Sequence, residues 1–197
     1  MATEDELDPP PISSPRLELI SMSVPFMEAI AESDLRGADQ AIGALVPAWL
    51  PGQLEHFVRY RLAQLEVDPS ARQWLGRAMI LTDEAGRRRV VGTIGFHGPP
   101  DEQGRLEIGY SVDPDFRRQG FASEAARALF EWAATTHGVR RFIASISPTN
   151  EASLGLAAGF GFEQTGSHMD DIDGLELVLE MDWPAEPAAA TVGADAG

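Results

Sequence analysis

The stretch that decides the fold of this chain is LEIGYSVDPDFRRQGFASEAA, which runs over residues 106–126. Its first seven residues place an apolar side chain at every second position, which predicts a strand over residues 106–112. Asp113-Pro114 ends this strand, because proline cannot donate a ladder hydrogen bond and restricts the residue before it. The turn that follows opens a helix, whose first backbone N–H groups lack partners and carry the positive end of the helix dipole. With two arginines beside it, this turn predicts a site for a phosphate-bearing ligand.

The same stretch resembles a known family. The spacing Arg117-x-x-Gly120-x-Ala122 is similar to the pyrophosphate-binding motif of the GNAT superfamily of N-acetyltransferases, which use acetyl-coenzyme A. With E-I-G-Y and D-P before it, the stretch resembles more narrowly the branch that includes the ribosomal-protein N-terminal alanine acetyltransferases. The resemblance implies that acetyl-coenzyme A binds along the end of the strand and at the turn, at Tyr110, Ser111, Val112, Arg117, Arg118, Gln119, Gly120, Phe121 and Ala122. The alternative is an ordinary basic surface turn.

A second stretch, PTNEASLGLAAGFGF at residues 148–162, resembles the N-x-x-S…G-F segment of the same branch. The resemblance implies that Asn150 contacts the pantetheine arm of the cofactor and that Ser153 lies near its thiol. The residues themselves allow a simpler interpretation. Asn150 is a good helix N-cap, and Ser153 can be an exposed serine on the helix surface. For Asn150 the two interpretations are compatible.

Acetyl transfer to an amine needs a neutral nucleophile, a stabilised oxyanion and a proton for the leaving thiolate. Glu107 alternates with Leu106 and Ile108, so its side chain points to the opposite face of the strand. In related enzymes a glutamate here often takes the proton of the amine, and the resemblance makes Glu107 the candidate base; the alternative is an exposed cross-strand pair. The superfamily often uses a tyrosine as general acid, but this chain has Ala157 at that position. Ser153 remains the candidate acid on the family pattern.

The composition predicts a single cytoplasmic domain. The chain has 197 residues, 44% of them hydrophobic, and no apolar run long enough to span a membrane. We expect an N-acetyltransferase domain over residues 16–183, between disordered tails at residues 1–15, which are acidic and rich in proline, and 184–197. The N-terminus does not have the pattern of a secretory signal. Cysteine is absent, which excludes disulfides and thiol catalysis.

The chain has fifteen basic residues, all of them arginine, and thirty-one acidic residues, which give a net charge of −16. Such a surface disfavours nucleic acid, because phosphate contacts need cations. The charge fits solubility, and it also fits an amine substrate attracted to an acidic site. Asp170, Asp171 and Asp173 resemble half of a calcium loop, but Met181 stands where the bidentate glutamate is needed, so no metal is predicted. A homodimer is left open.

The periodicities predict a mixed α/β (α+β) fold. Strands are expected at 16–23, 76–82, 89–96, 106–112, 141–147, 162–169 and 175–182, and helices at 51–67, 121–137 and 150–159, with two short helices within 23–48. The family resemblance implies a central, largely antiparallel sheet, splayed in the middle, with helices on both faces. The strands at 106–112 and 141–147 would part there, and the pantetheine arm would lie between them by β-augmentation.

The resemblance implies an enzyme that transfers the acetyl group of acetyl-coenzyme A directly to a primary amine in a ternary complex. The acceptor is left open among a protein N-terminus, an aminoglycoside-like polyamine and a small amino compound. One alternative is a non-catalytic sensor that binds acetyl-coenzyme A, since the tyrosine acid is missing. Another is a structural partner whose acidic tails recruit a basic protein. The four histidines, His97 and His168 among them, are expected to be structural or surface residues.

Overall fold

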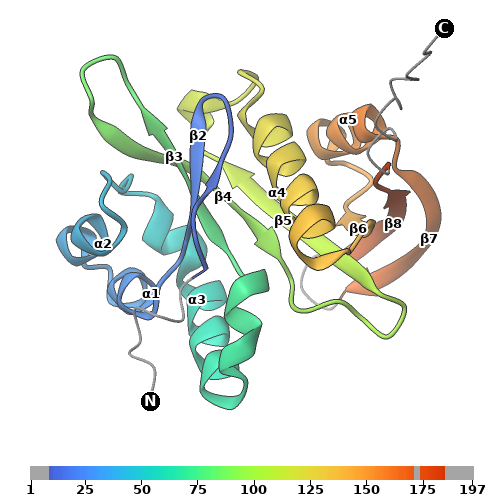
Figure 1. The fold of residues 1–197 in the computed structure, drawn as a ribbon, viewed down its shortest axis with the longest axis horizontal. Helices are drawn as coiled ribbons and strands as arrows, with labels where there is room; N and C mark the ends of the chain where they lie inside the picture. Colours follow the sequence, from blue (N-terminus) through green and yellow to red (C-terminus); the bar gives the residue numbers. More distant parts are fainter. Residues whose placement is uncertain (1–8, 171–173, 185–197) are drawn as a thin grey trace, which may run out of the picture.

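The computed structural model describes residues 9–170 and 174–184, which form an eight-stranded sheet with helices on both faces (Figure 1). The strand order is β1-β2-β3-β4-β5-β6-β8-β7, and every described neighbouring pair is antiparallel except β5 and β6. The strands are β1 (Ile12–Ser13), β2 (Leu17–Ser21), β3 (Arg77–Thr82), β4 (Arg88–Phe96), β5 (Arg105–Val112), β6 (Arg141–Ile146), β7 (Glu163–Asp170) and β8 (Gly174–Asp182). The predicted fold class is confirmed.

The helices bury one hydrophobic cluster on each face of the sheet. They are α1 (Val24–Ala31), α2 (Leu35–Ile42), α3 (Leu50–Val67), α4 (Phe121–His137) and α5 (Glu151–Phe160), with 3₁₀ turns η2 (Pro69–Trp74) and η3 (Pro114–Phe116). Helices α1 to α3 pack on the face that carries Ala78, Ile80 and Val90. Helix α4 covers the other face, against residues such as Leu19 and Val91.

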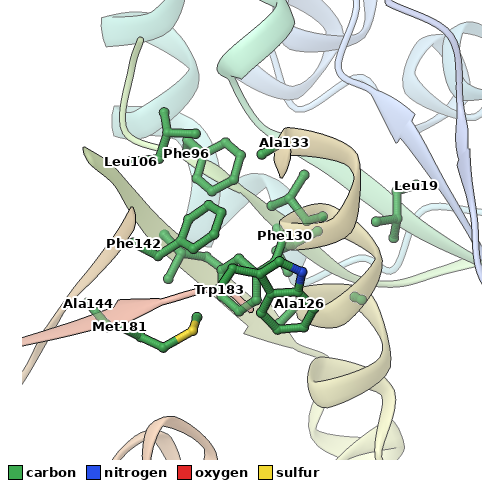
Figure 2. Close-up of a cluster of buried hydrophobic side chains, with 14 of the residues drawn as sticks. Leu19, Phe96, Leu106, Ala126, Phe130, Ala133, Phe142, Ala144, Met181 and Trp183 are labelled. Atoms are coloured by element: carbon green, nitrogen blue, oxygen red, sulfur yellow. The ribbon is translucent and has the colours of Figure 1, made fainter. Parts of the chain in front are cut away.

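Helix α4 is long and strongly packed, which fixes the turn that precedes it. Its Ala126, Phe130 and Ala133 point into the cluster shown in Figure 2. The Phe130 ring lies 4.4 Å from the ring of Phe142 on β6 and 5.4 Å from that of Trp183, which follows β8. The small alanines let the helix approach the sheet closely, while the aromatic rings fill the space beneath it. The helix ends at His137, where Gly138 adopts a left-handed φ of 70°.

Strands β5 and β6 diverge in the middle of the sheet. They pair only at Arg105–Arg141, Leu106–Phe142 and Glu107–Ile143 among the described residues. Beyond that point β5 stays paired with β4, from Ile108 to Val112, and β6 stays paired with β8. We call this divergence the β5–β6 fork. It agrees with the predicted splay between these two strands.

The N-terminal boundary differs from the prediction. Residues 1–15 were expected to be a disordered tail, but Ile12–Ser13 pairs with β2, and the Ile12 side chain is buried in the α4 cluster. The prediction failed here because a proline-rich stretch has no period that reveals a two-residue edge strand. The rest of the predicted tails, residues 1–8 and 185–197, and Asp171 and Asp173 of the predicted turn lie outside the described residues. The predicted boundaries of the longer elements agree within a few residues.

Candidate active site

The turn between η3 and α4 has the backbone of an anion-binding loop. Arg118 has a φ of 60° and Gly120 a φ of 82°, so two nearby residues are left-handed. No side chain caps the start of α4 at Gly120. Arg117 is held by a 3.0 Å hydrogen bond from its Nε to the carbonyl of Val112, which leaves the rest of its guanidinium for a ligand. The arrangement suits a phosphate group at the helix start.

Arg16 is a further cation at this loop, and sequence reasoning missed it. Its Nε donates to Glu124 Oε2 at 2.6 Å and its Nη1 donates to the carbonyl of Gln119 at 3.1 Å. Ser14 Oγ also donates to Glu124, at 2.7 Å. Burial raises the pKa of Glu124, but the hydrogen bonds from Ser14 and Arg16 outweigh it and lower the pKa overall. The β1–β2 hairpin therefore holds the loop from more than a hundred residues away.

At the β5–β6 fork, alternate backbone groups of β5 face the opening. The carbonyl of Glu107 and the N–H of Asp113 bond toward β4. Because hydrogen bonding alternates along an antiparallel strand, the backbone groups of Ile108, Tyr110 and Val112 point the other way, toward the fork. Tyr110 and Val112 thus present backbone groups toward the fork, where an extended ligand is predicted to pair. Ser111 differs: its backbone faces β4, and its side chain accepts a hydrogen bond from Gln53 at 2.8 Å.

Glu107 lies where the fork begins, on the face opposite α4. Ser145 Oγ on β6 donates to Glu107 Oε1 at 2.6 Å, and His97 Nδ1 lies 3.5 Å from Oε2. The contact with His97 lowers the pKa of Glu107; burial opposes this shift, and the hydrogen bond from Ser145 adds to it. The carboxylate is therefore ionised at neutral pH. Neither Ser145 nor His97 was singled out as a partner, because both come from other strands.

The imidazole of His97 lies over Gly109, at the side of a cleft under α3. A Cβ on Gly109 would come within 2.7 Å of His97 Nε2, so a larger residue there would displace the ring from its present position. The cleft, which we call the α3 cleft, has a volume of about 210 Å³ and lies between α3 and the ends of β4 and β5. His97 lines it and Glu107 does not. The histidine thus stands between the carboxylate and the cleft.

Ser153 and Asn150 lie at the start of α5. Asn150 caps the helix, its side chain accepting a hydrogen bond from the N–H of Ser153 at 3.1 Å, which confirms the N-cap interpretation. The Ser153 side chain lies near Tyr110, whose pKa is raised by burial and partly lowered by this serine. A phenol and a hydroxyl therefore meet across the fork. Ala157, the position of the family's tyrosine, is buried in the core.

The other predicted residues differ in accessibility. Phe121 is buried in the α4 cluster, so only its backbone can reach a ligand. Ala122 is half-buried, while Gln119 is exposed and its side chain donates to the carbonyl of Asp115. Across residues 9–170 and 174–184, no group of three His, Asp or Glu side chains is placed to hold a metal ion. None of the helices described has the length and apolar character to cross a membrane.

Comparison with known proteins agrees with this geometry. A family model described as an acetyltransferase (GNAT) domain matches residues 29–163. The chain belongs to the GNAT acetyltransferase family. The match includes the fork, the Glu107 cluster and the loop at Gly120. The protein is therefore an acetyl-transferring enzyme.

Two proteins of Bacillus subtilis (strain 168) have sequences similar to this chain. The chain is 26% identical to the uncharacterized N-acetyltransferase YjdG over 147 residues, which cover 75% of this chain and 86% of that protein. It is 37% identical to YoaA, an uncharacterized N-acetyltransferase of the same organism, over 79 residues. That match covers 40% of this chain and less than half (45%) of YoaA.

A solved structure of RimL, a ribosomal-protein alpha-N-acetyltransferase in complex with coenzyme A, has a TM-score of 0.60. The two sequences are 17% identical, and the superposition covers 88% of this chain and 98% of RimL. At this identity the likeness is one of fold.

Proposed function

We propose that this enzyme transfers the acetyl group of acetyl-coenzyme A to a primary amine, by direct attack in a ternary complex. The observation that carries the proposal is the β5–β6 fork. On one side it leads to the arginine- and glycine-containing loop, and on the other it borders the Glu107 cluster. A ligand bound at the loop and extended along β5 would end beside that cluster. The coenzyme A complex of RimL, a protein of the same fold, supports this choice of cofactor.

The residues present fit acetyl-coenzyme A. Arg117, Arg118 and the first N–H groups of α4 would hold its pyrophosphate, and Arg16 would keep the loop in shape. The backbone of Tyr110 and Val112 would pair with the amides of the pantetheine arm. When bound, the group supplies the activated acetyl carbonyl and a thiolate as leaving group. Asn150 would contact the arm from the start of α5.

Glu107 and His97 would act as a pair on the amine. The lowered pKa of Glu107 keeps its carboxylate charged, which makes it a weak proton acceptor but a good partner for a positive charge. His97 lines the α3 cleft, so it is placed to take the proton from the amine nitrogen while Glu107 stabilises the charge that results. The new bond joins the amine nitrogen to the acetyl carbon, and the bond from that carbon to sulfur breaks.

The leaving thiolate needs a proton, and Ser153 would give it. The raised pKa of Tyr110 keeps its phenol protonated at neutral pH. Because Ser153 lies near Tyr110, the phenol would be able to resupply the serine hydroxyl. The backbone at the fork would offer an N–H to the negative charge that develops on the acetyl oxygen.

The test is an amine panel with acetyl-coenzyme A, read as release of free thiol and as acetylated product. Acetylated amine with an equal amount of free thiol supports the proposal. Binding of acetyl-coenzyme A without turnover on any amine would favour the sensor instead. Absence of acetyl-coenzyme A binding would favour the other alternative, that the protein is a structural partner.

A further inference from the structure

The α3 cleft has a chemical character that bears on the acceptor. Among the described residues that line it, the apolar side chains come from α3 and the neighbouring strands, with Leu54, Phe57 and Met22 prominent. The polar residues that line it are Gln53, Thr93, Tyr110 and Ser111, together with His97. No Asp, Glu, Lys or Arg lines it. A second cation on the acceptor would therefore find no carboxylate partner inside the cleft.

A buried cation behind the cleft adds to this effect. Arg61 of α3 is 4% exposed, and its guanidinium lies 4.9 Å from the centroid of the Phe57 ring. It donates hydrogen bonds to neutral oxygens, those of Gln64 and of the His97 backbone. An ammonium in the cleft beside Phe57 would lie near this positive charge. Like charges repel, and they repel more strongly where little water separates them.

The size of the cleft also limits the acceptor. Its volume of about 210 Å³ is below the roughly 300–1,000 Å³ of pockets that bury drug-sized ligands. One apolar side chain or a short alkyl chain fills this space, whereas most of an aminoglycoside would lie outside it. Gly95 and Gly76 both line the cleft, and their backbones pack closely, because a Cβ on Gly95 would come within 2.7 Å of Gly76 Cα.

We propose that the acceptor is a primary monoamine with an apolar group close to the amine. The apolar group occupies the α3 cleft between Phe57 and Leu54, and the amine lies at His97. This inference rests on the proposed function and selects among its substrates. It excludes polyamines and aminoglycosides, despite the net negative charge of the chain. A free amine and a protein N-terminus with an apolar first residue share this chemistry.

A pair of amines of equal chain length tests the proposal. The full chain is assayed with n-hexylamine and hexamethylenediamine, which differ by one terminal ammonium. We expect kcat/KM to be higher for n-hexylamine by at least about tenfold. Equal or better use of the diamine would overturn the inference and leave the proposed function intact. Failure to acetylate any amine would overturn both. Leucinamide and a short peptide that begins with leucine then separate the two sources of the amine.

Variants of α3 tie the preference to the cleft. Phe57→Ala should reduce the preference for n-hexylamine about tenfold by raising its KM. Tyr60→Ala is the matched control: Tyr60 also contacts the Arg61 guanidinium, with its ring centroid at 5.2 Å, but it is 61% exposed and does not line the cleft. Gln53→Glu at the exposed wall should shift the preference toward the diamine, and it remains informative if Phe57→Ala folds poorly. An unchanged preference in both variants would contradict the assignment.

Discussion

Glu107 is the residue on which the proposed chemistry depends most. Its carboxylate is held by Ser145 from β6 and approached by His97 from the end of β4. These contacts exist only because three strands meet at the fork. A change that removes the charge of Glu107 but keeps its shape therefore isolates its electrostatic role.

Glu107→Gln should lower kcat by about 10²–10⁴-fold, with little change in the KM for acetyl-coenzyme A. The loss should shrink as pH rises, because more of the acceptor amine is already neutral. Steady-state kinetics across pH measure both effects, and Glu102→Gln, at an exposed position in the loop before β5, is the control. A near-normal kcat at neutral pH would contradict the role of this carboxylate.

His97→Gln should act in the same direction as Glu107→Gln, because the two residues are proposed to work as a unit. The double variant should then lose little more activity than the more damaged single variant. His56→Gln, at an exposed position on α3, controls for the loss of a histidine. If the fold-loss of activity in the double variant equals the product of the two single fold-losses, the residues act independently, contrary to the proposal.

The same carboxylate predicts how stability depends on pH. The folded protein lowers the pKa of Glu107, so its contribution to stability is fully present above the unfolded value of about 4.5. That contribution is lost as pH falls through the lower folded pKa. The difference in the free energy of unfolding between wild type and Glu107→Gln should therefore shrink on acidification. Urea unfolding at several pH values measures it, and a difference that grows toward acid pH would be the opposite of what we expect.

At this scale the sequence predicted single residues but not their partners. Glu107 was found through the family resemblance, on a strand that is otherwise apolar. Asn150 was found through the same resemblance, and its role as an N-cap could be predicted because helix capping is local. Ser145 and His97 were missed as partners of Glu107 because they come from other parts of the sheet. The sequence alone does not show which residues of different strands become neighbours. Tyr110 was expected to bind the cofactor, and only the folded chain brings it to Ser153.

Among the elements, the loop before α4 depends on backbone conformation more than on side chains. Gly120→Val should greatly weaken coenzyme A binding, because valine is strained at the φ of 82° and its side chain would crowd the helix start where the phosphate is proposed to bind. The strain also costs about 1–3 kcal/mol of stability. Gly86→Val, at a φ of 76° in the β3–β4 turn, carries the same strain far from the loop. Calorimetry should find normal affinity in Gly86→Val, and equal losses in both variants would refute the loop assignment.

The β1–β2 hairpin supports the same loop through Arg16. Arg16→Ala removes the bond to the Gln119 carbonyl and leaves the Glu124 carboxylate without its guanidinium, next to the proposed phosphate position. Affinity for coenzyme A should fall about tenfold, as expected for the loss of a charged hydrogen bond. Arg36→Ala, at an exposed position on α2, should have no effect. If calorimetry finds normal affinity for coenzyme A in both variants, the hairpin does not contribute to the binding site.

The elements that the sequence predicted best are those with a long, regular period, such as α3, α4 and β5. Edge strand β1 was missed because Pro9-Pro10-Pro11 indicates a tail and two residues show no alternation. The 3₁₀ turn η2 was missed because its hydrogen bonds are too local and short to leave a periodic pattern.

For the molecule as a whole, the sheet is one body opened at its centre, so a ligand bound at the fork should stabilise the entire fold. Acetyl-coenzyme A at about one hundred times its Kd should add about 2.7 kcal/mol to the free energy of unfolding. For a chain of this size, that raises Tm by about 5–10 °C. Thermal scanning should show this shift for wild type and a much smaller one for Gly120→Val at the same ligand concentration. An equal shift in both proteins would place the ligand elsewhere.

The measurement that tests the central claim most directly follows the acetyl group itself. Wild type, Glu107→Gln and Gly120→Val are incubated with acetyl-coenzyme A labelled in its acetyl group and with n-hexylamine, and the products are analysed by mass spectrometry. We predict one labelled acetyl group on the amine nitrogen and one equivalent of free coenzyme A thiol with wild type, with strong loss in both variants. Bound acetyl-coenzyme A with no acetylated amine, or equal product from all three proteins, would contradict the account.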